Sequence, residues 1–344
     1  KSQRSKMFRS PSAGIWAHDC SVTTTQHDQR SPEYELLVDQ IQAMLHQEET
    51  GYACCANYTT QRRQSTDENA GIISESWRQK ICEWGFEVVD HFDYSREVVS
   101  KTMSFLDRYV SSSVKKGSFI SRKEFQLAAV ACLYIAIKME GNQRAFDRRS
   151  PLLTISTLVN LGRGIFSAKA IKGMEQKILS SLGWRMNPPT SFHFISLFTE
   201  LFLAYNGCDG LHKNVRNDII EAARYLSELS ICVSSLAIEC KPSIIALASL
   251  HNALDFANSE NKKWDSYTFF IGKIHQITNI HPESDQLQEV RASLKKMCPS
   301  IHSVECDILA EGKQNEEDSR SSVTGSASPV CVSGQKRSFD STSL

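Results

Sequence analysis

The sequence lacks the cysteine and histidine spacings that bind metal ions. Its 11 cysteines are scattered, with no C-x-x-C pair and no histidine cluster at the spacing of zinc ligands. It also lacks a net charge, because Lys+Arg and Asp+Glu number 39 each, and no overall positive field favours a nucleic-acid backbone. We therefore expect no metal site, no nucleic-acid partner, and reduced thiols in an intracellular protein.

Long hydrophobic runs and catalytic motifs are missing as well. The longest uncharged apolar stretch, residues 127–137, is much shorter than the roughly 20 residues that cross a bilayer. The chain contains no H-E-x-x-H, no P-loop, no G-x-G-x-x-G and no G-x-S-x-G. We therefore expect a protein that is not an enzyme, has no cofactor and does not enter a membrane.

What the sequence does contain is the hydrophobic spacing of helices. The two ends, residues 1–30 and 301–344, are rich in polar residues and are predicted to be disordered arms. A short amphipathic helix follows the first arm, with Pro32 at its first position, and residues 31–73 hold this helix and a linker.

Residues 74–187 are predicted to form a first helical bundle. One helix starts near Ser74, and the segment from Phe125 to Met139 is apolar on nearly every side, so it must be surrounded by other helices. Gly183 is suited to end the last helix of the bundle. Two prolines and a threonine at 188–190 then break the chain, and this is the predicted domain boundary.

Residues 188–300 are predicted to form a second, similar bundle. Its expected helices cover residues 192–205, 215–229 and 243–256, with weaker ones after Trp264 and Pro282. Placing Leu127 on Ile244 superposes three alanines and a leucine on identical residues. The predicted fold is therefore all-α: two consecutive five-helix bundles, an N-terminal helix and disordered tails.

Four charged residues lie beside apolar helix faces in the first bundle: Arg78, Asp107, Lys138 and Glu175. A charge next to a core costs several kcal/mol unless it is paired or reaches water. From spacing alone, these residues are either functional or ordinary solvated helix edges.

The same residues fall within motifs that resemble those of the cyclin family. The matching segments are W-R-Q-K-I-C-E-W (77–84), F-L-D-R-Y (105–109), F-Q-L (125–127) with A-I-K-M-E (136–140), and M-E (174–175). They occur in the family's order, and residues 74–187 and 188–300 resemble its N-terminal and C-terminal cyclin boxes.

The resemblance implies a regulatory subunit that binds and activates a cyclin-dependent serine/threonine protein kinase in cell-cycle control, in the nucleus, the cytoplasm or both. Arg78 and Asp107 would form a structural ion pair, Leu127 would lie in the core, and Lys138 and Glu175 would contact the kinase. The N-terminal helix would lie against the kinase or the second box.

The family also implies a surface that recruits substrates or inhibitors through a short basic-hydrophobic motif. Its positions here are Trp77, Ile81, Trp84, Glu87 and Gln126. Lys80 stands where an aliphatic residue is usual, and its charge would repel a basic peptide. Docking and a purely structural role for the tryptophans both stay open.

Three other functions also stay open. The chain could be a transcription-linked cyclin, which activates a kinase outside the cell cycle. It could be a scaffold with the cyclin fold that binds no kinase. A transcription-initiation factor of the same fold is the third, but such a factor should carry a zinc ribbon and a basic face, and the sequence shows neither.

Overall fold

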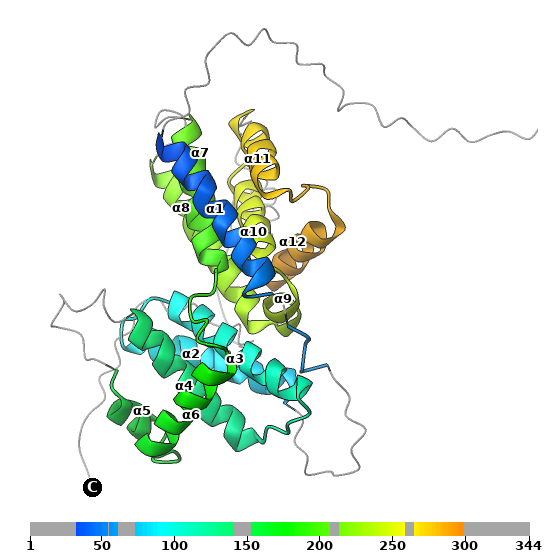
Figure 1. Cartoon of the computed structure of the whole chain (residues 1–344). Coiled ribbons are helices and arrows are strands. Elements are labelled where there is room, and N and C mark those ends of the chain that lie inside the picture. Colours follow the sequence, from blue (N-terminus) through cyan, green and yellow to red (C-terminus); the bar gives the residue numbers. More distant parts are fainter. Residues whose placement is uncertain are drawn as a thin grey trace, which may run out of the picture. The chain divides into compact units, whose positions relative to one another are not determined.

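The computed structural model describes residues 32–53, 55–60, 73–140, 153–206, 213–258 and 265–298, and every regular element within them is a helix (Figure 1). These residues belong to one compact unit that ends at Cys298. The predicted all-helical fold is confirmed, whereas the two predicted arms lie outside the described residues.

The first bundle consists of five helices: α2 (Glu75–His91), α3 (Glu97–Lys115), α4 (Arg122–Glu140), α5 (Ile155–Leu161) and α6 (Ala168–Ser181). The central helix α4 contacts the other four. Alanines and large aliphatic residues are buried on nearly every side of α4 between Phe125 and Ile137, as its sequence predicts. Leu127 is half-buried and packs against this core.

Local signals in the sequence explain where these helices begin and end. The Ser74 hydroxyl accepts a hydrogen bond from the Trp77 amide at 3.4 Å, and Ser167 caps α6 in the same way. Gly117 and Gly183 follow α3 and α6 with φ angles of 76° and 58°, a conformation that glycine adopts without strain.

The second bundle contains six helices: α7 (Ser191–Asn206), α8 (Lys213–Cys232), α9 (Ser234–Glu239), α10 (Pro242–Asn258), α11 (Asp265–Thr278) and α12 (Asp285–Met297). Its central helix α10 contacts α7, α8 and α12. The sequence predicts five helices here. The additional one, α9, has six residues, which is too short for a helical period to be recognised.

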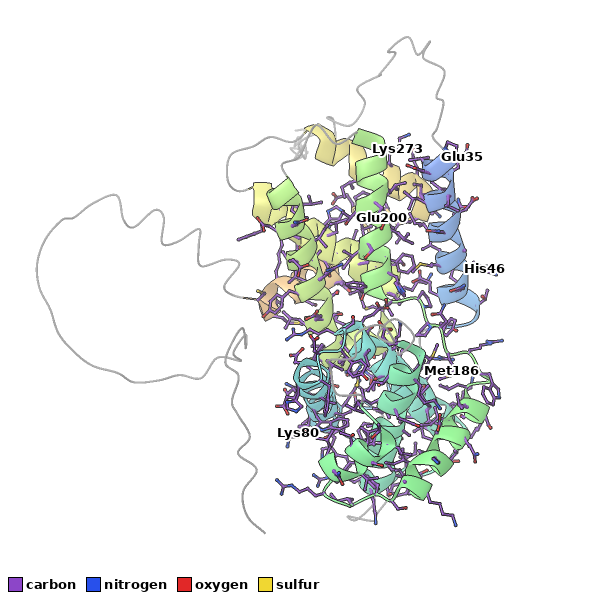
Figure 2. The ribbon with its side chains drawn as sticks, turned by 90° about the vertical axis from the view of Figure 1, so that its left-hand side faces the viewer. Glu35, His46, Lys80, Met186, Glu200 and Lys273 are labelled. Carbon is purple, nitrogen blue, oxygen red and sulfur yellow. The ribbon has the colours of Figure 1, made fainter. Side chains whose placement is uncertain are left out.

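The N-terminal helix α1 (Pro32–Thr50) packs on the second bundle, where it contacts α7 and α11. Figure 2 shows Glu35 and His46 of α1 beside Glu200 of α7. The Glu48 carboxylate accepts hydrogen bonds from the amide of Ser243, at 3.0 Å, and from its hydroxyl, at the start of α10. Of the two locations that the resemblance implies, the structure therefore places α1 on the second bundle.

Candidate functional site

The structure brings Lys138 and Glu175 together at one end of the central helix. Lys138 lies in the last turn of α4, and its ammonium group donates to a carboxylate oxygen of Glu175 in α6. The ammonium group also lies 4.9 Å from the centre of the Tyr134 ring, a cation–π contact. The Lys138 side chain is 51% exposed, whereas that of Glu175 is 11% exposed.

This geometry leaves Lys138 able to bind an outside group. An ammonium group carries three donors, and Glu175 accepts one of them. Charge-assisted hydrogen bonds strengthen when a partner excludes water. The pair therefore combines a fixed position with unused donors at a surface.

Exposed apolar side chains occur on α4, on α5 and in the turn before α6. Met139 follows Lys138 in α4, Leu161 ends α5, and Ile165, which is 61% exposed, lies in the turn before α6. Helix α5 contacts both α4 and α6. Large apolar residues exposed at a surface are typical of a protein-binding face.

Among the large apolar side chains that the structure describes, that of Trp184 is the most exposed, at 71%. It follows Gly183 with a φ of 60°, an unusual angle for a bulky residue, and its amide donates to the Leu179 carbonyl at 3.0 Å. This left-handed turn after α6 holds the indole out of the core. We use the name α4–α6 surface for the set Lys138, Met139, Leu161, Ile165, Glu175 and Trp184, which lie on α4, α5 and α6 and in the turns at the two ends of α6.

Sequence reasoning selects the two charges of this surface but misses its four apolar members. Trp184 offered a signal, because it stands directly after the glycine that ends α6 and outside the apolar stripe of that helix. Met139, Leu161 and Ile165 offered none, because an apolar residue beside a core stripe is more often buried than exposed.

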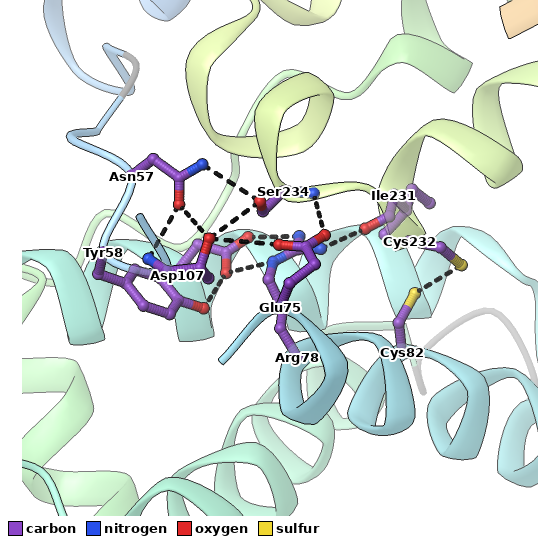
Figure 3. A network of polar contacts seen from close by, with 10 residues as sticks. Asn57, Tyr58, Glu75, Arg78, Cys82, Asp107, Ile231, Cys232 and Ser234 are labelled. Atoms are coloured by element: carbon purple, nitrogen blue, oxygen red, sulfur yellow. Dashed lines mark hydrogen bonds and ion pairs between the residues drawn. The ribbon is translucent and has the colours of Figure 1, made fainter. Parts of the chain in front are cut away.

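Arg78 and Asp107 form a bidentate ion pair between α2 and α3 (Figure 3). The guanidinium Nε and Nη2 donate to the two carboxylate oxygens at 3.0 and 2.8 Å, and the Tyr58 hydroxyl donates to the same carboxylate at 2.7 Å. Burial opposes the charge of Arg78, but the Asp107 carboxylate outweighs it, and the pKa of Arg78 is raised. The cluster is structural, since Arg78 has no exposed surface.

The same cluster also joins the two bundles. Arg78 Nη1 donates to the Ile231 carbonyl near the end of α8 at 2.7 Å, and the Glu75 carboxylate accepts from the Ser234 amide at 2.8 Å. Asn57 donates to the Ser234 hydroxyl at 3.1 Å. No local sequence pattern contains these contacts, because their partners lie about half the chain apart.

Four of the implied docking residues lie on α2, and the fifth, Gln126, lies in the first turns of α4, which contacts α2. Trp77, Ile81, Trp84 and Gln126 are half-buried, and Glu87 is exposed. The three apolar side chains pack against the core, so their burial serves the bundle while part of each faces solvent. Two cations lie beside these residues: Lys80 points into solvent (Figure 2), and the Arg122 guanidinium lies 4.7 Å from the Trp77 ring.

The described residues contain no group of three or more His, Cys, Asp or Glu side chains that could hold a metal ion. Within the same residues, no helix has the length and apolar character needed to span a membrane.

Comparison with known proteins agrees with the motifs. Residues 39–187 match the family model of the cyclin N-terminal domain. The chain is 29% identical over 214 residues to Cyclin-A1-4 of Oryza sativa subsp. japonica, covering 61% of this chain and 54% of that protein. It is 28% identical over 181 residues to G2/mitotic-specific cyclin-1 of Antirrhinum majus, covering 53% of this chain and 33% of that protein.

The fold is also that of a solved cyclin. A viral cyclin from herpesvirus saimiri superposes with a TM-score of 0.51 at 15% identity, covering 79% of this chain and 99% of that one. The fold and the α4–α6 surface thus define a helical protein built on the cyclin box. Residues 39–187 thus form a cyclin N-terminal domain, and the chain spans about half or less of the length of the two curated relatives described above.

Proposed function

We propose that this cyclin binds and activates a cyclin-dependent serine/threonine protein kinase in cell-cycle control. The observation that carries the proposal is the Lys138–Glu175 pair, which is fixed between α4 and α6 at an exposed position and accompanied by exposed apolar side chains. A relative named for the G2/mitotic phase supports the cell-cycle part of the proposal.

The mechanism follows from what a kinase needs. A protein kinase is active only when a strand lysine pairs with a glutamate of its mobile helix, so that the ATP phosphates are positioned. A partner that binds the inward position of that helix more tightly than the outward one shifts the population toward the active state. Lys138 and Glu175 would bind polar backbone groups beside that helix.

The apolar members of the α4–α6 surface would supply the rest of the binding energy. Trp184 and Ile165 lose solvent contact when a partner covers them, and a buried tryptophan is a common centre of binding energy. In this mechanism the cyclin contributes binding energy and no chemical group, so we expect no catalytic activity from the chain alone.

We further propose that the exposed side of α2 recruits substrates or inhibitors of the kinase. The half-buried Trp77, Ile81 and Trp84 offer apolar contacts, and Glu87 offers a negative charge to a basic motif. Lys80 and Arg122 oppose such a motif by charge, so this docking would be weak.

The test exchanges the charges of the proposed kinase contact. In Lys138→Glu/Glu175→Lys, the two side chains still attract each other, so the bundle keeps its pair while a partner meets reversed charges. We expect binding to a cyclin-dependent kinase to fall at least about 100-fold, with loss of kinase activity in the complex. The measurement is co-purification of the tagged chain from its native cell extract, followed by a kinase assay.

The matched control is the exposed pair formed by Lys241 and Glu49, whose atoms lie 2.8 Å apart on the second bundle. The exchange Lys241→Glu/Glu49→Lys should leave kinase binding unchanged. Equal kinase activity with all three proteins would refute the assigned contact. A wild-type chain that recovers no active kinase would favour a scaffold, and recovery of a transcription-linked kinase would move the protein out of the cell cycle.

A further inference from the structure

Two cysteines face each other where the two bundles meet. Cys82 lies in α2 and is buried, and Cys232 is the last residue of α8 and is half-buried. Their sulfur atoms lie 3.3 Å apart, as drawn in Figure 3. A disulfide bond is about 2.05 Å long, so the two sulfur atoms would need to approach by roughly 1.2 Å to form one.

The surrounding hydrogen bonds hold this contact in place. Glu75, Arg78 and Cys82 follow one face of α2, at spacings of three and four residues. Glu75 and Arg78 bind backbone groups on either side of Cys232, namely the Ser234 amide and the Ile231 carbonyl. The two thiols therefore meet as part of a built interface, with two polar anchors beside them.

The two thiols differ in a way that suits stepwise oxidation. The hydrogen bond from Cys82 and the charge of Arg78 lower the pKa of Cys232, although burial opposes them. The same hydrogen bond, together with burial, raises the pKa of Cys82 well above its ordinary value. Cys232 is thus the more exposed thiol and the one that ionises first, and thiolates are the form that oxidants attack.

We propose that Cys82 and Cys232 form a reversible disulfide that links the first bundle to the second when the protein meets hydrogen peroxide. The bond would link α2, the helix that carries Arg78, Trp77 and Trp84, to the end of α8. In reducing surroundings the pair stays as thiols, since disulfides inside cells are usually transient and redox-sensing.

The reaction proceeds in two balanced steps. The Cys232 thiolate attacks one oxygen of hydrogen peroxide, the O–O bond breaks, and hydroxide leaves and takes up a proton to become water. The Cys82 sulfur then attacks the sulfenic sulfur of Cys232, and the departing hydroxyl takes the Cys82 proton as a second water. Two thiols are oxidised by two electrons, and a dithiol reductant reverses the bond.

The test uses the full chain, treated with hydrogen peroxide at a few molar equivalents, alkylated and mapped by mass spectrometry. We expect the peptides that contain Cys82 and Cys232 to be linked in most molecules, and dithiothreitol to release them. Because the bond closes a long loop, the melting temperature of the oxidised chain should rise by about 5–10 °C.

Three variants make the test specific. Cys82→Ala and Cys232→Ala should both abolish the link and the rise in melting temperature, and circular dichroism checks that each variant folds. Because Cys82 is buried and Cys232 only half-buried, Cys232→Ala stays informative if Cys82→Ala unfolds. Cys240→Ala, which changes another half-buried cysteine of the second bundle, should leave both effects intact.

Two results would overturn the proposal. The first is oxidation of Cys232 to sulfenic or sulfinic acid with no linked peptide. The second is a Cys82–Cys232 link that forms as readily in the guanidinium-unfolded chain as in the folded chain, since the contact in the fold would then not favour this pairing. Neither result depends on kinase binding, so the outcome is independent of the proposed function.

Discussion

The central helices of the two bundles end in opposite ways. In the register of their shared alanines, Lys138 of α4 lies at the position of Asp255 in α10. Lys138 pairs with a single carboxylate, that of Glu175 in α6. Asp255 instead binds two cations of α12, Arg291 at 2.6 Å and Lys295 at 3.1 Å. Both bundles thus join the end of the central helix to another helix by charge, but with the signs exchanged.

The difference indicates which bundle has a charged group available to bind an outside partner. Asp255 satisfies two cations of its own bundle, whereas Lys138 is the more exposed of the two and has donors to spare. Exposed large apolar residues also occur in the first bundle, at Phe119, Met139, Leu161, Ile165 and Trp184. Among the described residues of the second bundle, Phe256 is the one large apolar side chain that is exposed. One architecture has therefore produced an open surface in the first bundle and a closed one in the second.

The largest effect on stability should come from the buried ion pair of the first bundle. Asp107→Asn keeps the shape of the side chain but removes the charge that Arg78 needs. Because Arg78 is fully buried, we expect a loss of about 3–5 kcal/mol in the free energy of unfolding, measured by urea denaturation.

The matched change in the second bundle is Asp255→Asn. Its carboxylate is 38% exposed, so water screens the pair, and we expect a loss of at most about 1 kcal/mol. Similar losses in the two variants would mean that burial does not set the strength of these pairs.

The second prediction concerns the apolar part of the α4–α6 surface. Trp184→Ala should weaken kinase binding about 30-fold, because a tryptophan covered by a partner contributes strongly to affinity. It should change the free energy of unfolding by less than about 0.5 kcal/mol, since the side chain lies mostly in solvent. Binding is measured by titration calorimetry. Phe256→Ala is the control, and an equal loss of affinity in that variant would place the partner on both bundles.

The third prediction is a pH dependence that belongs to the second bundle. Burial, helped by the charge of Arg291, lowers the pKa of His251 in α10 to about 4. In the unfolded chain this histidine binds a proton near pH 6.5, whereas in the folded chain it stays neutral until about pH 4. The free energy of unfolding therefore falls as the pH drops from 6.5 toward 4. Between pH 7 and pH 5 this loss should reach about 2 kcal/mol.

His251→Gln should remove that part of the acid sensitivity, as judged from urea midpoints at the two pH values. The corresponding residue of the first bundle is Tyr134, so this histidine belongs to the second bundle alone. If the variant lost as much stability on acidification as the wild type, the sensitivity would have to come from another group.

The sequence predicts most of the helices because they carry a regular apolar stripe or, as in α4, are apolar on nearly every side. It also predicts a break between the bundles at the prolines before Thr190. It does not locate α5 or α9, whose seven and six residues are too few to show a period. It also gives no sign that Arg78 reaches the Ile231 carbonyl, or that Cys82 meets Cys232.

The reason is physical and concerns distance along the chain. Helical period and capping depend on neighbours within one or two turns, which the sequence contains directly. A contact between α2 and α8 depends on how the two bundles pack against each other. The exposure of a side chain such as Trp184 depends on whether any other part of the folded chain covers it. The charged members of the site were recognisable by motif, and the apolar members required the structure.

The smallest effect should come from Lys80, an exposed residue of α2 beside the implied docking residues of the first bundle. Lys80→Leu removes a charge that repels a basic peptide and adds apolar area beside Trp77, Ile81 and Trp84. Surface charges contribute a few tenths of a kcal/mol to about 1 kcal/mol, so we expect a two- to fivefold gain in affinity for a basic-hydrophobic peptide. Fluorescence polarisation measures it, with Lys116→Leu on the turn after α3 as the control. No gain would mean that the tryptophans of α2 serve the core alone.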